Sequence, residues 1–88
     1  MNEMPESFIV TVINASGSFE ADLEIPSRLP FAEMKGKLLE ILKILDKQEF
    51  YDWQDCALQY KNRVLAEDET IADVGAFDGS RLVAVVKV

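Results

Sequence analysis

Side chains that could catalyse a reaction or bind a metal are scarce in this 88-residue chain. It contains no histidine, which removes the commonest general base near neutral pH and the commonest metal ligand. Its single cysteine, Cys56, lies in an apolar, strand-like context, so we expect a packed, reduced thiol. The four glycines are scattered singly, which argues against a phosphate-binding loop. The acidic run Glu67, Asp68 and Glu69 lacks the alternating oxygen ligands of a calcium loop and is predicted to be a solvated turn. We therefore predict a protein that is not an enzyme, with no catalytic residue, cofactor or metal.

Composition narrows the remaining classes of function. Sixteen acidic residues against nine basic ones give a net charge of −7, which repels phosphate backbones and disfavours nucleic-acid binding. No apolar run approaches the roughly 18–20 residues that a membrane span needs, and the start of the chain lacks the basic residues of a signal peptide. We expect a cytoplasmic protein without direct membrane insertion. Residues 1–7 are predicted to be a flexible leader and residues 8–88 a single domain.

The element that must organise this domain is one long helix, predicted over residues 29–46. Pro30 suits its first turn, where the missing N–H costs nothing. Gly36 in mid-helix costs roughly 1 kcal/mol relative to alanine, so we expect it to mark a close approach of another backbone. Three- and four-residue spacing of apolar residues predicts the buried face, which consists of Phe31, Met34, Leu38, Ile41, Leu42 and Leu45.

Short alternating segments on both sides of the helix predict strands. They cover residues 8–13, 19–25, 56–60, 64–65 and 81–88, with a short helical turn at residues 71–74 that Thr70 caps and Gly75 closes. The last strand is almost continuously apolar, which favours a central position beside the first strand, parallel to it across a crossover. The predicted fold is α+β with β-grasp topology: a mixed four- to five-stranded sheet packed on one long helix, in the order ββαββ(short α)β.

Residues 47–55 carry three aromatic side chains without clear periodicity. Phe50, Tyr51 and Trp53 either cover one end of the core or anchor an interface. We favour the core interpretation, in which the segment is a loop or single turn.

Strand alternation also predicts an unusually apolar surface on the side of the sheet that faces away from the helix. If Phe8, Val10 and Val12 point inward together with Leu82, Ala84 and Val86, the opposite face carries Ile9, Thr11, Ile13, Gln59, Val83 and Val85. These residues are either an ordinary scatter of exposed side chains or a docking surface for another protein or a second copy of the chain, a homodimer. A one-residue error in the register of the first strand would exchange its two faces.

A second feature of the same region is an acidic row on the second strand. Glu20, Asp22 and Glu24 alternate with the apolar residues and are predicted to face water, where they discourage edge-to-edge aggregation. They would gain a function only opposite a basic partner.

The chain resembles ubiquitin over residues 8–88. The most specific portion is residues 64–76 (VLAEDETIADVGA) followed by Leu82, which has an apolar residue, an acidic loop, a Thr-apolar-x-Asp turn and a final apolar strand. Within that superfamily it is most similar to the small YukD/EsaB-type ubiquitin-like proteins of bacterial type VII secretion systems. The residues that carry this similarity are the Leu29-Pro30-Phe31 entry into the helix and residues 74–82 (VGAFDGSRL).

The resemblance implies a cytosolic, non-catalytic accessory or regulatory component of a type VII secretion system. Such a protein would dock onto cytoplasmic parts of the membrane complex and be recruited to the inner face of the membrane. A ubiquitin-like modifier or sulfur carrier is the alternative; it needs a C-terminal Gly-Gly, whereas this sequence ends in Lys87 and Val88. Gln59 stands where ubiquitin has the central isoleucine of its recognition patch, so ubiquitin receptors are not expected to bind.

Overall fold

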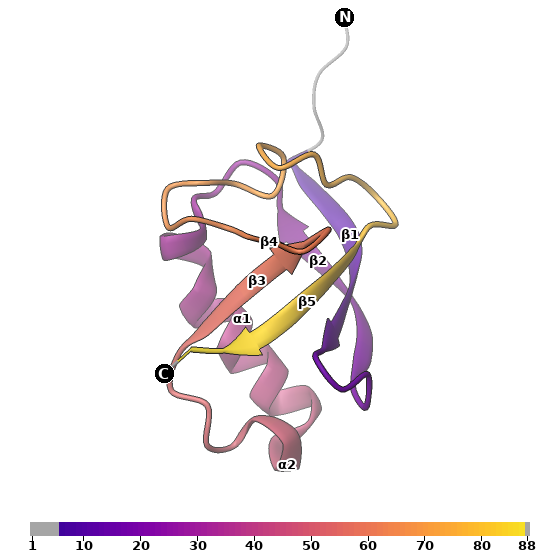
Figure 1. The fold of residues 1–88 in the computed structure, drawn as a ribbon, viewed down its shortest axis with the longest axis vertical. Helices are drawn as coiled ribbons and strands as arrows, with labels where there is room; N and C mark the ends of the chain where they lie inside the picture. Colours follow the sequence, from indigo (N-terminus) through magenta and orange to yellow (C-terminus); the bar gives the residue numbers. More distant parts are fainter. Residues whose placement is uncertain (1–5, 88) are drawn as a thin grey trace, which may run out of the picture.

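A computed structural model describes residues 6–87, which form one sheet and two helices (Figure 1). The elements in chain order are β1 (Ser7–Asn14), β2 (Glu20–Pro26), α1 (Phe31–Leu45), α2 (Lys47–Phe50), β3 (Cys56–Tyr60), β4 (Arg63–Val64) and β5 (Arg81–Val86). The predicted α+β, β-grasp architecture is confirmed. None of the described helices is long and apolar enough to cross a membrane.

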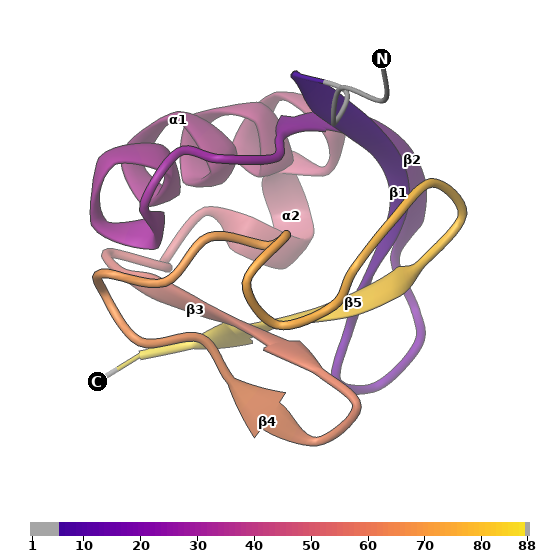
Figure 2. The ribbon, with the colours of Figure 1, turned by 90° about the horizontal axis from the view of Figure 1, so that it is seen from above.

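The sheet has the strand order β2-β1-β5-β3-β4. β1 and β5 occupy its centre and run parallel, with Val12 beside Leu82, while the other neighbours are antiparallel. This arrangement confirms the central position predicted for the last strand. Figure 2 shows the sheet curving around α1, with β1 and β2 along one side of the helix and β3 and β5 beneath it. One face of the sheet is therefore covered by α1 and the other is not.

The register of β1 agrees with the alternation of its residues. Phe8, Val10 and Val12 are buried under α1, together with Leu82 and Ala84 of β5. Val86 was expected in the same inward row, but its side chain is 48% exposed. Because β1 ends at Asn14, opposite Ala84, no β1 residue lies beside Val86 to cover it.

α1 buries a narrower face than its apolar spacing predicts. Phe31, Met34, Leu38 and Leu42 are buried, whereas Ile41 is half-buried and Leu45, the last helical residue, is exposed. Gly36 lies on the solvent side, and a Cβ placed on it would meet nothing within 4 Å beyond its own helical turns. The expected close approach of another backbone at Gly36 is therefore wrong.

The aromatic segment after α1 covers one end of the core. Asp46 caps α2 by accepting a hydrogen bond from the Glu49 backbone N–H (3.2 Å). Phe50 is fully buried, and its ring packs edge-on against Phe19 (5.0 Å between centroids) and Trp53 (4.8 Å). The core interpretation is confirmed for Phe50 and Trp53. It is wrong for Tyr51, which is 70% exposed because it follows α2 on the side away from the core.

The short helix and the start of the first strand lie elsewhere than predicted. The short helix lies at α2 and not at residues 71–74, which form a turn in which Thr70 and Asp73 exchange side-chain-to-backbone hydrogen bonds of 3.0 Å. β1 begins at Ser7, and the Ser27 N–H donates to the carbonyl of Glu6 (2.9 Å), so this end of the predicted leader joins the sheet. Residues 1–5 of that leader, and Val88, lie outside the described residues.

Candidate protein-docking face

The six residues predicted to form a binding surface lie on the face of the sheet opposite α1. We call this surface the helix-free face. Adjacent partners in a sheet point to the same side, so Ile13, Val83 and Gln59 form one row across β1, β5 and β3. The remaining members are Ile9, Thr11 and Val85, which alternate with buried residues of β1 and β5.

The six side chains of the helix-free face differ in their exposure to solvent. Ile9 is 57% exposed, whereas the other five side chains are half-buried. Neighbouring strands shield the side chains of the central rows from water, while the Ile9 side chain lies nearer the end of the sheet. The structure thus brings all six residues onto one surface, and their role in binding stays a prediction.

A row of carboxylates borders the helix-free face on β2. Glu20, Asp22 and Glu24 lie directly opposite Ile13, Thr11 and Ile9 in the register. The Thr11 hydroxyl donates to Asp22 (2.7 Å), the Ser7 hydroxyl donates to Glu24 (2.6 Å), and Arg81 lies 3.4 Å from Glu20. These contacts hold the carboxylates in place but leave them exposed. Arg81, the β5 partner of Thr11, stands on the same face, so the face is apolar around Val83 and Val85, charged at Arg81 and acidic along one side.

Two further exposed apolar residues lie in segments next to this face and were missed by sequence reasoning. Val64 is the register partner of Gln59 on β4, a strand too short to show alternation. Phe77 is 61% exposed in the loop before β5. That loop is held against β1, since the Gly79 N–H donates to the Ile9 carbonyl (2.8 Å) and the Ile9 N–H donates to Asp78 Oδ1 (2.9 Å). This long-range contact brings the loop that carries Phe77 next to Ile9.

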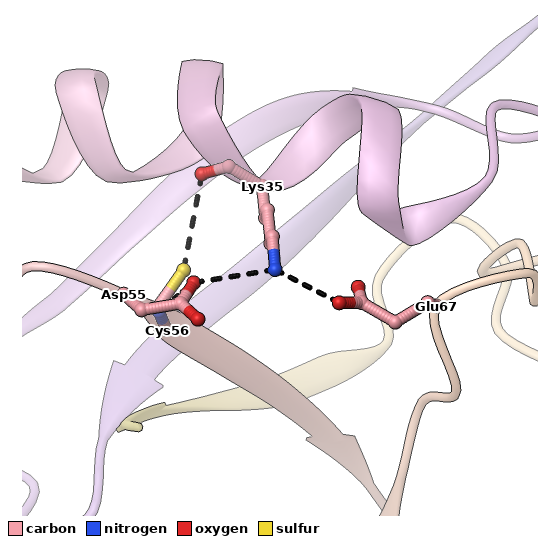
Figure 3. A network of polar contacts seen from close by, with 4 residues as sticks. All are labelled: Lys35, Asp55, Cys56 and Glu67. Atoms are coloured by element: carbon pink, nitrogen blue, oxygen red, sulfur yellow. Dashed lines mark hydrogen bonds and ion pairs between the residues drawn. The ribbon is translucent and has the colours of Figure 1, made fainter. Parts of the chain in front are cut away.

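A network of polar contacts lies on the helix side of the sheet (Figure 3). Lys35 of α1 bridges Asp55 (3.4 Å) and Glu67 (2.9 Å), which joins the helix to the start of β3 and to the loop after β4. The hydrogen bond from Lys35 to Glu67 is the main cause that raises the pKa of the Lys35 ammonium. The backbone N–H of Cys56 and then the Lys35 charge lower the pKa of the Asp55 carboxyl. This network ties three segments together.

Cys56 is buried beside this network and has no reactive character. Its Sγ lies 3.8 Å from the Lys35 carbonyl. Burial, reinforced by the nearby Asp55 carboxylate, raises the pKa of the thiol to about 11. Such a thiol is protonated at neutral pH, whereas the thiolate is the nucleophile and metal ligand. The expected packing of Cys56 is confirmed.

The acidic loop of Glu67, Asp68 and Glu69 has a structural use. Glu67 pairs with Lys35, and Glu69 pairs with Arg63 and accepts a hydrogen bond from the Ala66 N–H (2.8 Å). Two of the three carboxylates are therefore occupied by cations of the chain itself, so the predicted solvated turn is only partly correct. Over residues 6–87, no three cysteine, aspartate or glutamate side chains are grouped so as to hold a metal ion.

The chain matches known proteins in structure and not in sequence. No protein-family model and no curated protein sequence matches the chain. Among solved structures, the ubiquitin-like domain of the Mycobacterium tuberculosis type VII secretion system protein EccD1 superposes with a TM-score of 0.75. This match is 21% identical and covers 90% of this chain and 97% of that domain. The chain has a ubiquitin-like fold.

Two other structures extend this likeness. The ubiquitin of Caldiarchaeum subterraneum has a TM-score of 0.62 at 19% identity and covers 93% of this chain and 95% of that protein. A chain of the ESX-5 inner membrane complex has a TM-score of 0.74 at 16% identity, and the match covers 96% of this chain but only 22% of that one. The ubiquitin-like resemblance inferred from the sequence is thus confirmed, and its solved neighbours include type VII secretion components.

Proposed function

We propose that this ubiquitin-like domain is a non-catalytic protein-binding module that serves a type VII secretion system as an accessory or regulatory component. The observation that carries the proposal is the helix-free face, on which Ile9, Val83 and Val85 leave apolar surface uncovered. The structural neighbours of this domain include the EccD1 domain and a chain of the ESX-5 inner membrane complex. The partner is a cytoplasmic part of the secretion membrane complex, and binding recruits the domain to the inner face of the membrane.

The arrangement of the face defines what would fit it. A standard interface needs about 800 Å² on each partner, a modest share of the 5601 Å² that this chain exposes. Ile9, Val83 and Val85 supply apolar area, and Arg81 stands on the same face beside Thr11. Glu20 and Glu24 border the face on β2. The complementary surface is apolar with basic residues along one side. Charge at such a rim selects partners and speeds their encounter more than it adds affinity.

The proposal is tested by affinity capture of the tagged protein from its own cells under mild detergent. Val85→Asp places a charge on the face, beside the row of Ile13, Val83 and Gln59. Ile44→Asp makes the same change on α1, on the opposite layer, at a side chain that is already 76% exposed. We expect wild type and Ile44→Asp to recover secretion-complex subunits and Val85→Asp, shown by circular dichroism to be folded, to lose them.

Other outcomes would overturn parts of the proposal. Equal recovery by all three proteins would remove the helix-free face as the binding site. Recovery of no secretion component by any of them would remove the secretion role. Dimers of wild type that Val85→Asp dissolves, seen in sedimentation, would assign the face to a second copy of the chain.

A modifier or sulfur-carrier role is the second candidate, and the likeness to the Caldiarchaeum ubiquitin favours it. Both activities leave a covalent trace, as an isopeptide conjugate or a thiocarboxylate. Intact-mass analysis of the protein from its own cells distinguishes them from the binding module, which should be recovered without either adduct.

A further inference from the structure

A second unpartnered surface lies at the edge of the sheet, where β2 is the outermost strand. Within residues 6–87, β2 pairs only with β1. The Ser27 N–H donates to the Glu6 carbonyl and the Asn14 N–H donates to the Phe19 carbonyl, which shows that odd-numbered residues of this strand turn their backbone groups toward β1. By the alternation of an antiparallel ladder, the N–H and C=O groups of Glu20, Asp22 and Glu24 point outward from the sheet. Pro26 ends this row because it has no N–H.

The inner side of the same edge is incompletely covered by α1. The inward-facing side chains in the middle of the sheet, such as Val12 and Leu82, are buried, but Ala21 and Leu23 of β2 are only half-buried. In Figure 2, β2 lies at the end of the curved sheet, beyond β1. Residues of β2, of α1 and of the segment between them line a groove of about 100 Å³. Its lining is mainly apolar (Leu23, Ile25, Leu29, Met34, Leu38 and Ile41) and is completed by Glu24, Pro26 and Lys37. We call it the edge groove.

The edge groove offers a partner both an apolar surface and unpaired backbone groups. Its apolar walls can take small apolar side chains, and the backbone groups beside it can pair with another strand. An extended segment that pairs with β2 would send every second side chain into the groove, because side chains alternate along a strand. The intervening side chains would stand beside Glu20, Asp22 and Glu24, where opposite charges on directly facing residues stabilise the pairing.

We infer that β2 and the edge groove bind an extended segment of a partner protein in which apolar and basic residues alternate, as a sixth strand of the sheet. The charge pattern selects this occupant. A second copy of β2 would place carboxylates against carboxylates, which is destabilising between facing positions. The inference does not depend on the helix-free face, since the groove opens on the opposite side of the sheet, and the secretion role can fail without affecting it.

The probe is a blocked octapeptide of alternating valine and lysine, titrated into the full chain labelled with ¹⁵N. We expect shifted amide signals along Glu20 to Glu24 and around Lys37 and Ile41, and slower hydrogen exchange at the Asp22 and Glu24 amides. The matched variants are Ile41→Lys, which places an ammonium group in the groove, and Ile44→Lys, which makes the same charge change on an exposed side of α1. Ile41→Lys should weaken binding at least about tenfold and Ile44→Lys by less than about twofold.

Controls separate strand pairing from attraction between a basic peptide and an acidic protein. The same peptide is made with alternate backbone nitrogens methylated, in two versions that cover both sets, and with its residues reordered as Lys-Lys-Val-Val. At least one methylated version and the reordered peptide should lose binding. Equal binding of all the peptides, or shifts confined to the helix-free face, would overturn the inference. Amide shifts along the groove on deleting residues 1–5, or on dilution of the free protein, would also overturn it, by showing that the chain itself or a second copy occupies the site.

Discussion

Replacing Gly36 by alanine should stabilise this domain, although the glycine stands in the middle of the helix that organises the fold. Gly36 is the sixth residue of the 15-residue α1, faces solvent, and has no atom within 4 Å of the position that a Cβ would take beyond its own turns. The change therefore adds helix propensity without a clash. The expected gain is about 1 kcal/mol, because glycine is less favourable than alanine by that amount in a helix interior.

Gly79→Ala is the matched control. Its Cβ position is equally open, but its φ is +89°, and its N–H donates to the Ile9 carbonyl. An L-residue pays roughly 1–2 kcal/mol to adopt a left-handed backbone conformation, so the same substitution should destabilise the domain here. The two substitutions should therefore change the free energy of unfolding in opposite directions, because only Gly79 has a positive φ.

Urea denaturation followed by circular dichroism measures both variants. Gly36→Ala should raise the midpoint with an unchanged slope, and should raise the melting temperature by about 4–8 °C for a domain of this size. Gly79→Ala should lower both. A destabilised Gly36→Ala would refute the reasoning, because it would mean that another part of the chain packs on this turn of α1. A neutral Gly79→Ala would show that the loop before β5 adapts its backbone freely.

Three other results are expected from the same structure. Phe50→Ala should cost about 3–5 kcal/mol of unfolding free energy, because it empties the site between Phe19 and Trp53, whereas Tyr51→Ala should change it by less than about 0.5 kcal/mol; urea titrations compare the two. Trp53 fluorescence should resist acrylamide quenching in the native protein and lose that protection in urea; free quenching of the native protein would contradict its place in the core. Cys56 should react with iodoacetamide at pH 8 far more slowly in the native protein than in the unfolded one. Because burial raises its pKa from 9.0 to about 11, its stabilising contribution is present below pH 9 and lost as the pH rises through 11, an effect that Cys56→Ala should abolish.

The sequence could predict the two faces of the central strands because alternation has an unambiguous period. Val12 and Leu82 are register partners and both are fully buried, so the inward row was identified on both strands. Once that row is known, the outward positions of Ile13 and Val83 follow. Alternation reports only which side a residue points to, however. It could not show that β1 stops opposite Ala84 and leaves Val86 uncovered.

The positions of loop residues could not be predicted for a related reason. Phe77 has no periodic neighbours, and its loop lies next to Ile9 only because Gly79 and Asp78 bond to that residue, a contact that joins distant parts of the chain. α2 was expected as a loop or single turn because its four residues are too few to show a helical period. The Asp46 cap that starts it was present in the sequence and is the signal that could have identified it.

The edge groove could not be predicted from the sequence, because it depends on where α1 lies across the sheet. The apolar residues on the inward side of β2 and on α1 predict that both elements are buried. They do not predict whether the helix lies over β2 or over other strands. Here α1 buries Met34, Leu38 and Leu42 fully, and Ile41 on its flank only in part, while Leu23 across from it stays half-buried. The helix thus approaches β3 more closely than β2 and leaves the edge strand short of cover. At this edge the incompletely covered apolar side chains line a groove beside backbone groups that β1 does not pair. This is the arrangement that an added strand requires.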